Sequence, residues 1–340
     1  MPECGSQCWL CDLPIHFDTY EGCTHDCRYC FARKSKDIEK VGFHEGVKQL
    51  RDFVEGKRTI ETNWCDWKIP IHIGGMSDPF QPLEAKYRRT YECLKVLAET
   101  QHPVIISTKG RLCVTPEYLD LLHRCNVCMQ VSVVCASYDK IEKGAPPFEE
   151  RLEMVRTLAS AVKRVNVRVQ PYMHEVYREV LDNIPRFAEA GAFGVTFEGM
   201  KFQKKKQGLI KVGGDMVYPV DILKHDFERF REACHENELA FWSGENRLRR
   251  MGDSLTCCGI EGLEGFRPNV YNLNHLLNGD KAEPTELMLQ QGTAKCFHSA
   301  DQSAGSFERV RDMSFKDAML LTYAKSKKTC DEALGVGLQL

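Results

Sequence analysis

The densest group of metal-ligating side chains in the sequence is the run Cys23-Thr-His-Asp-Cys27-Arg-Tyr-Cys30. Its three thiols have the spacing CxxxCxxC and follow a predicted strand. Each can bind one iron of a cubane iron–sulfur cluster, which leaves the fourth iron without a protein ligand. Metal chemistry on a bound molecule needs such an open position, as catalytic zinc does. A zinc or electron-transfer site would instead need a fourth ligand, for which His25 is the only candidate in the run.

A second run with this spacing, Cys4-Gly-Ser-Gln-Cys8-Trp-Leu-Cys11, lies near the amino terminus. A proline and a strand-like stretch follow it where a cluster loop should lead into a helix, so it suits the open iron site less well. Thiols this close together favour a second iron–sulfur cluster or a zinc ion. Cys257 and Cys258 are adjacent, and a disulfide between them would be strained. We expect an auxiliary metal site in which the amino-terminal trio is joined by Cys257 or Cys258; reduced structural thiols are the alternative.

Composition limits the class of protein. Seventeen of the 340 residues are cysteine, and such a density in a reducing compartment is typical of bound metal. The formal net charge is -2, with 43% hydrophobic and 28% charged residues, as in soluble globular proteins. No apolar run approaches the ~18 residues of a membrane span, and no signal-peptide core precedes the first motif. We expect a cytoplasmic protein with no membrane partner.

Positive charge gathers in the run Lys201-Phe-Gln-Lys-Lys-Lys206. Lysines near a binding site could contact phosphate, but a solvated loop is the usual structure of a charge run. The near-neutral total charge supplies no general attraction to nucleic acid.

Short β-branched runs alternate with longer amphipathic stretches along the chain. Thr115-Pro116 is a typical helix start. Strand–helix alternation of this kind predicts a parallel sheet with right-handed crossovers. The predicted strands are 15–20, 69–75, 103–109, 128–135, 164–171, 194–198 and 239–243; the predicted helices are 44–55, 83–100, 116–125, 148–163, 176–191 and 221–237.

Polar residues end most of these strands, which is typical of the mouth of a β/α barrel. No strand leads into a GxGxxG loop, which argues against a dinucleotide site. We predict an α/β fold, a partial (β/α)6 TIM-type barrel over 15–245. A Cys-rich segment at 1–14 precedes it, and a Cys-containing extension at 246–340 follows it. The residues concerned are Gly74, Gly75, Ser77 and Asp78 after the second strand, Thr108 and Lys109 at the end of the third, Ser132 in the fourth, and Gln170 and Glu198 at the ends of the fifth and sixth.

The cluster loop resembles that of the radical S-adenosylmethionine (SAM) superfamily, which has this CxxxCxxC spacing and an aromatic residue, here Tyr29, before the last Cys. The resemblance is closest to the spore photoproduct lyase-like branch and covers residues 15–200. Its further motifs are Tyr20-Glu-Gly-Cys23, Gly74-Gly-Met-Ser-Asp-Pro79, Ser107-Thr-Lys109, Val131-Ser-Val133 and Glu142-Lys-Gly-Ala-Pro-Pro-Phe148.

The resemblance implies a [4Fe–4S] cluster on Cys23, Cys27 and Cys30, with SAM bound at the open iron. Ser77 should contact the SAM amine, Lys109 and Ser132 its carboxylate, and Tyr29 should lie near the adenine; Gly74 and Gly75 belong to the same site. A lysine ammonium and a hydroxyl suit a carboxylate.

By the same resemblance, reductive cleavage of SAM gives a 5′-deoxyadenosyl radical that abstracts hydrogen from a substrate. The electron comes from a cellular reductant of the flavodoxin or ferredoxin type. Spore photoproduct lyase has a hydrogen-donating Cys after the second strand, where this sequence has Gly75-Met76-Ser77, so its mechanism of dimer repair is not expected. The branch favours a nucleic-acid base or nucleotide as substrate. Radical modification of a peptide or protein is the alternative, and a non-catalytic iron–sulfur or zinc protein is an alternative of a different class; the sequence singles out no catalytic residue.

Overall fold

A parallel sheet of seven strands forms the centre of the protein. The computed structural model describes residues 3–4, 10–34, 37, 40–59, 62, 67–212, 215–270, 272, 274–275 and 278. The sheet order is β1-β2-β5-β6-β7-β8-β9-β12, with β1 antiparallel to β2 and the other pairs parallel. The strands are β1 (Glu3–Cys4), β2 (Ile15–Phe17), β5 (Ile71–Ile73), β6 (Val104–Thr108), β7 (Val127–Ser132), β8 (Arg164–Tyr172), β9 (Gly194–Gly199) and β12 (Ala240–Ser243).

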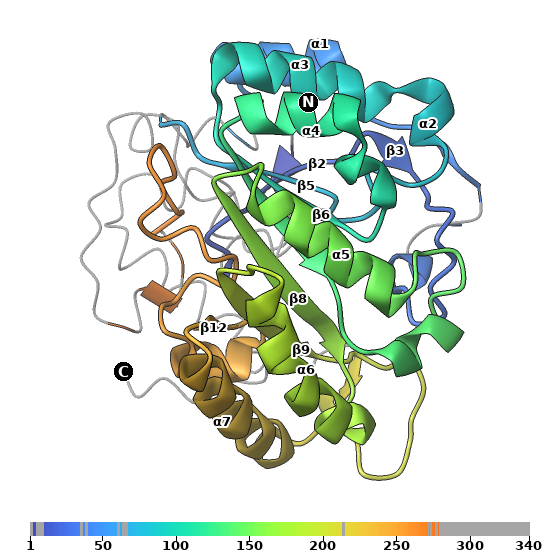
Figure 1. The fold of residues 1–340 in the computed structure, drawn as a ribbon, viewed down its shortest axis with the longest axis vertical. Coiled ribbons are helices and arrows are strands. Elements are labelled where there is room, and N and C mark those ends of the chain that lie inside the picture. Colours follow the sequence, from blue (N-terminus) through green and yellow to red (C-terminus); the bar gives the residue numbers. More distant parts are fainter. Residues whose placement is uncertain are drawn as a thin grey trace, which may run out of the picture.

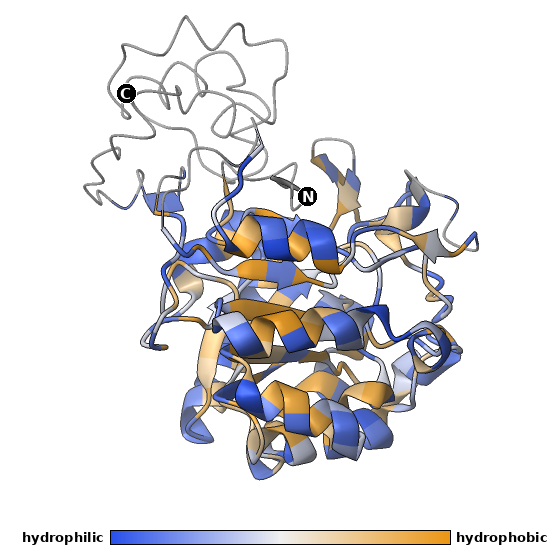
Figure 2. Cartoon of the chain, turned by 90° about the horizontal axis from the view of Figure 1, so that it is seen from above, coloured by the Kyte–Doolittle hydropathy of each residue, from blue (hydrophilic) through white to orange (hydrophobic). Residues whose placement is uncertain are grey.

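Helices cover one face of this sheet, and Figure 1 shows α3 to α7 side by side in front of the strands. Figure 2 shows hydrophobic and hydrophilic residues alternating along these helices, as in amphipathic helices that bury one face. One large apolar core fills the space between the two layers. The helices are α1 (Val47–Val54), α2 (Glu84–Tyr87), α3 (Arg89–Thr100), α4 (Pro116–Arg124), α5 (Phe148–Ala159), α6 (Tyr177–Glu189) and α7 (Val220–Glu236).

Smaller elements lie in the loops. Two small antiparallel sheets pair β3 (Tyr20–Glu21) with β4 (Gly42–Phe43) and β10 (Ile210–Val212) with β11 (Asp215–Val217). The 3-10 helices are η2 (Phe31–Lys34), η3 (Arg111–Val114), η4 (Ala136–Lys140), η5 (His174–Val176) and η6 (Asn246–Met251).

The predicted α/β fold is confirmed, and each predicted strand overlaps an observed one to within a few residues at its ends. The prediction of one helix over 83–100 is wrong. Arg88 has a left-handed backbone (φ 51°) that ends α2 and precedes α3. Tyr87, the last residue of α2, is 42% exposed.

The inner face of the sheet, away from the helices, carries polar side chains. Along β8, Val165, Val167 and Val169 enter the core, so Asn166 and Arg168 point to the opposite face, because side chains alternate along a strand. The strand order leaves β2 and β12 as distant strands of one sheet, so the barrel is partial. No helix among the described residues is long and apolar enough to cross a membrane.

Candidate functional site

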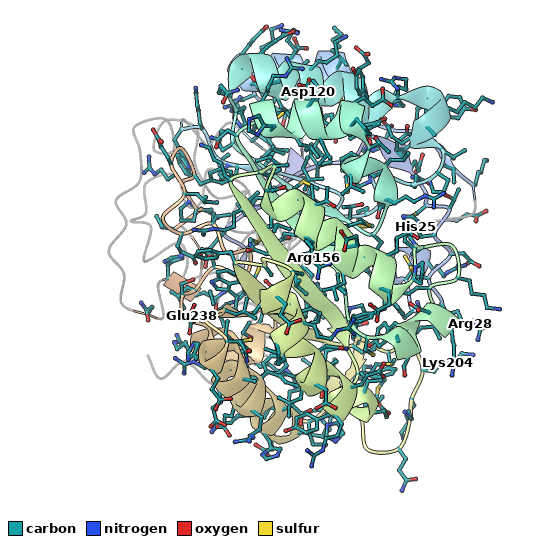
Figure 3. The ribbon with its side chains drawn as sticks, in the orientation of Figure 1. His25, Arg28, Asp120, Arg156, Lys204 and Glu238 are labelled. Atoms are coloured by element: carbon teal, nitrogen blue, oxygen red, sulfur yellow. The ribbon has the colours of Figure 1, made fainter. Side chains whose placement is uncertain are left out.

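The loop that bears Cys23, Cys27 and Cys30 runs from β3 to η2 and is fixed by main-chain contacts with two distant segments. On one side, Gln81 accepts a hydrogen bond from the Thr24 amide (3.0 Å) and donates to the Gly22 carbonyl (3.2 Å). These two hydrogen bonds tie the cluster loop to the segment that follows β5. Figure 3 shows His25 and Arg28 of this loop on the side of the molecule opposite Glu238, which precedes the amino end of β12.

On the other side, the turn after η4 packs on the same loop. The Arg28 amide donates to the Ile141 carbonyl (2.9 Å), and the Gly144 amide donates to the His25 carbonyl (3.0 Å). A Cβ at Gly144 would lie 2.5 Å from the Thr24 carbonyl oxygen. Glycine at this position lets the two backbones approach.

The three thiols of the loop are near enough for their charges to interact, Cys23 with Cys27 and Cys27 with Cys30. Burial raises the pKa of the Cys27 thiol to about 11, which Lys109 and Arg151 oppose. Among the described residues, no three His, Cys, Asp or Glu side chains already surround one point as metal ligands. As donors, three thiols on one short loop suit a cubane with one open iron.

His25 is not available as a fourth ligand, because both of its ring nitrogens are engaged. Nδ1 lies 2.9 Å from the Gly144 carbonyl oxygen and Nε2 lies 3.2 Å from Asp78 Oδ2. Asp78 also accepts from Thr108 Oγ1 (2.7 Å) and from the Lys109 amide (2.6 Å). Burial alone would raise the pKa of Asp78, but the His25 charge and these hydrogen bonds lower it to about 2. Asp78 therefore joins the cluster loop to the end of β6.

Three of the predicted SAM contacts come together around a buried ion pair. Lys109 Nζ lies 3.8 Å from Glu142 Oε1 and 5.8 Å from the centre of the Tyr29 ring, and the Tyr29 hydroxyl donates to Glu142. Arg151 lies 2.6 Å from Glu142 and donates to the Ser132 carbonyl (2.9 Å). Both partners of the Arg151–Glu142 pair have fully buried side chains.

The other predicted contacts lie in the turn after β5. Gly74 has φ +90°, and a Cβ there would lie 2.2 Å from the Ser107 carbonyl oxygen, so only glycine fits. At Gly75 a Cβ would lie 3.0 Å from His16 Nδ1. The Ser77 hydroxyl donates to the Tyr20 carbonyl (2.7 Å), and Asp18 accepts from the Met76 and Ser77 amides.

A chain of hydrogen bonds crosses the inner face of the sheet above these residues. His72 Nε2 lies 2.8 Å from Ser107 Oγ, which also accepts from Arg168 (2.5 Å). Arg168 donates to Gln170, and Gln170 donates to Glu198. Burial lowers the pKa of His16 and of His72, with help from Arg168, so both imidazoles are neutral near pH 7.

Sequence reasoning found some of these groups and missed others. Gln170 and Glu198 were predicted from their place at strand ends. Arg168 and His72 lie inside strands and were missed, although the alternation of polar residues with valines along β8 is a usable signal. The contacts of Asp18 and Gln81 join distant segments and leave no local pattern.

The auxiliary cysteines are only partly described. Cys11 and Cys257 pack against the same small apolar cluster, of which Cys258 is a buried member. Cys4 lies in β1, nothing is described of its side chain, and Cys8 lies outside the described residues.

The basic run at 201–206 is partly neutralised by ion pairs. Lys201 pairs with Glu198 and Lys206 with Glu175, each at 2.6 Å.

Comparisons with known proteins place this geometry in a family. Residues 17–196, more than half of the chain, match the model of the radical SAM superfamily. Uncharacterized proteins of Mycobacterium bovis and Mycobacterium tuberculosis are 28% identical over 217 residues, which is 58% of this chain and 62% of theirs. The chain thus spans less than two thirds of the length of these relatives.

Two solved enzymes are similar in fold. A spore photoproduct lyase complexed with dinucleoside spore photoproduct has a TM-score of 0.56 at 16% identity, over 68% of this chain and 76% of that one. Streptococcus suis SuiB bound to its precursor peptide SuiA has a TM-score of 0.50 at 12% identity, over 68% and 49%. The family match and the cluster loop agree: the chain belongs to the radical SAM superfamily, whose cofactors are a [4Fe–4S] cluster and SAM.

Proposed function

We propose that this protein is a radical SAM enzyme that abstracts hydrogen from a nucleic-acid base or nucleotide bound against the inner face of β5 to β9. Cys23, Cys27 and Cys30 would hold the iron–sulfur cluster, which together with SAM would supply the radical chemistry. The protein's own groups bind and orient the two molecules and keep water away from the reacting atoms.

Four side chains are suited to hold SAM. The Ser77 hydroxyl proton is engaged with the Tyr20 carbonyl, so its oxygen can only accept, which suits the SAM amine. Lys109 at the end of β6 supplies a positive charge for the carboxylate, and the Ser132 hydroxyl can donate to it. The Tyr29 ring, held by Glu142, offers a flat face for the adenine.

The substrate proposal rests mainly on the position and contacts of Arg168. Its half-buried guanidinium lies on the inner face and donates to Ser107 and Gln170, which are both uncharged. In the described chain no carboxylate lies within ion-pair distance of it. A half-buried cation without an ion pair suits an anionic group of the substrate, such as a phosphate.

The side chains around Arg168 are suited to bind the base of a nucleotide whose phosphate is held by Arg168. Gln170 carries an amide, and amides recognise base edges through paired donors and acceptors. The neutral His16 and His72 rings stack edge to face, with centroids 5.3 Å apart. A neutral imidazole has one donor and one acceptor, of which His72 already uses Nε2 with Ser107, so this end of the surface is suited to hydrogen bonding more than to charge.

The test compares nucleotides with peptides as stimulators of 5′-deoxyadenosine formation by the reduced, SAM-bound protein. Nucleotides or oligonucleotides should stimulate it, and with a deuterated substrate the product should carry deuterium. Arg168→Gln should raise the KM for the nucleotide roughly ten- to hundredfold, because a charge-assisted hydrogen bond contributes about 1.5–3 kcal/mol. The matched control is Arg156→Gln, on the exposed side of α5 and paired with Glu153. Stimulation by peptides alone, or an unchanged KM, would contradict the proposal.

The reductant should be a small acidic electron-transfer protein of the flavodoxin or ferredoxin type. Beside the cluster loop, Arg28, Lys140 and Lys143 are exposed, and Phe31 is 55% exposed. Cations around an apolar residue attract an acidic partner and speed its docking. Lys140→Glu with Lys143→Glu should slow reduction by flavodoxin roughly tenfold at low salt, while reduction by dithionite stays unchanged. Equal slowing with both reductants would show a damaged cluster loop instead.

A further inference from the structure

A second group of thiols lies on the inner side of the partial barrel, away from the cluster loop. Cys11 comes from the segment before β2, and Cys257 and Cys258 come from the loop after η6. The Cys257 and Cys258 sulfurs are 3.6 Å apart. Cys11 is near enough to both of them for their charges to interact. Two sequence-distant segments therefore bring three thiols into one place.

The surrounding contacts fix this place firmly against the strands. The Cys258 carbonyl accepts from Gln130 (3.2 Å) and Asn166 (2.9 Å), and the Cys257 carbonyl accepts from Thr196 (2.6 Å). These donors come from β7, β8 and β9. The two thiols are thus presented by a backbone that the sheet holds rigidly.

Asp12 adds an oxygen donor beside the thiols. It is 5% exposed, and its charge acts on Cys11, Cys257 and Arg249. Its Oδ1 accepts from Asn272 (2.6 Å) and lies 3.0 Å from His275 Nε2, whereas its buried Oδ2 has no hydrogen-bond partner. Ligating carboxylates are typically oriented by hydrogen bonds of this kind to the other oxygen.

Arg249 supplies compensating charge. Its guanidinium is 7% exposed and hydrogen-bonds the Cys257 sulfur. Three thiolates and a carboxylate around a divalent ion would leave a net negative charge in a buried place, and a neighbouring cation offsets part of it.

We propose that Cys11, Cys257, Cys258 and Asp12 bind a zinc ion separate from the iron–sulfur cluster. Tetrahedral zinc with Zn–S bonds of about 2.3 Å places two sulfurs about 3.8 Å apart, close to the 3.6 Å between Cys257 and Cys258. The groups do not already surround one point in the described chain, so binding requires rotation of at least one side chain. With four protein ligands the site would be closed and structural.

The zinc would join the two sides of the open barrel. Cys11 lies just before β2, on one side of the sheet, and Cys257 follows β12, at the other end of the strand order. Hydrogen bonds already run between these segments, from the Asn269 amide to the Asp12 carbonyl (2.8 Å) and from Asn274 to the Leu10 carbonyl (2.9 Å). The ion would add a bond between segments that the sheet itself does not pair.

The test measures zinc and iron in the full chain purified without oxygen, independently of activity. The wild type should hold about one zinc in addition to the roughly four irons of one cubane. Cys257→Ser, Cys11→Ser and Asp12→Asn should each lose the zinc and keep the iron. Cys23→Ala should lose the iron and keep the zinc. Cys234→Ser, a buried thiol on α7, is the matched control and should keep both.

Cobalt(II) bound to the wild type in place of zinc gives a second readout that needs no variant, since thiolate ligands produce a charge-transfer band. Four irons with no zinc and no cobalt band would overturn the proposal. So would a Cys257–Cys258 disulfide, or excess iron lost together from the Cys11 and Cys257 variants. Loss of zinc from Cys8→Ser with retention in Asp12→Asn would refute the carboxylate as the fourth ligand.

Discussion

Arg151 has no exposed side-chain surface, so its replacement by methionine tests how the SAM site is held together. Its guanidinium lies 2.6 Å from Glu142 and donates to the Ser132 carbonyl (2.9 Å). The variant would leave a fully buried Glu142 carboxylate with Lys109 at 3.8 Å, the Tyr29 hydroxyl and the His25 charge as its remaining favourable partners. Removing one partner of a buried ion pair costs about 3–5 kcal/mol, a large part of the ~5–15 kcal/mol stability of a typical domain.

The assay is urea unfolding of the protein with its cluster intact, followed by tryptophan fluorescence, with SAM binding measured in parallel. Arg151→Met should lower the free energy of unfolding by about 3–5 kcal/mol and weaken SAM binding, because Ser132, Tyr29 and Lys109 lose their common anchor. Adding Glu142→Gln removes the uncompensated charge and should restore part of the stability. Arg156→Met, on the exposed side of the same helix, should cost no more than about 1 kcal/mol.

The reasoning would be refuted if Arg151→Met cost less than about 1 kcal/mol, the value of a surface pair. It would also be refuted if Glu142→Gln made the Arg151→Met variant still less stable. In that case the ion pair would not be what fixes the site.

Two further predictions concern the strand ends and the response to acid. Gly74→Ala places a Cβ 2.2 Å from the Ser107 carbonyl oxygen at a left-handed φ. It should weaken SAM binding by roughly five- to thirtyfold by displacing the turn, since that backbone alone costs ~1–2 kcal/mol. Gly42→Ala, with nothing within 4 Å, is the matched control, and equal SAM affinity in both variants would contradict the argument. Burial lowers the pKa of His102 to about 4 from 6.5, so below pH 6.5 the unfolded chain binds more protons and stability should fall by ~3 kcal/mol down to pH 4. Urea midpoints measured across this range should fall less steeply in His102→Gln, and an unchanged slope would show that His102 is not the group responsible.

The fold was predictable because its signals are local. Each strand is a short β-branched run, and β6 is buried along its whole length, as strands of a parallel sheet are. The prediction of one helix over 83–100 failed because a single left-handed residue, Arg88, breaks a pattern that is periodic on both sides of it.

Only the site residues that belong to a sequence motif could be predicted. The spacing of Cys23, Cys27 and Cys30 predicts a cluster loop only together with its place after the first strand, because Cys4, Cys8 and Cys11 have the same spacing. The 141–144 turn holds the loop through backbone atoms, which leave no trace in residue type. Gln81 holds it through its side-chain amide, but nothing in the local sequence links this glutamine to a loop more than fifty residues away. Arg168 was not predicted because it lies in the middle of β8, whereas the site residues were expected only at the carboxyl ends of strands.

The most direct test of the central claim is 5′-deoxyadenosine formation by the anaerobically reconstituted protein given SAM and dithionite. The wild type and Cys234→Ser should form it, and Cys27→Ala should not, because the loop then lacks one of its three thiolates. If the wild type holds a full cubane and forms no 5′-deoxyadenosine with any nucleotide or peptide present, the proposed radical SAM activity is contradicted. The protein would then be better explained as a non-catalytic iron–sulfur protein.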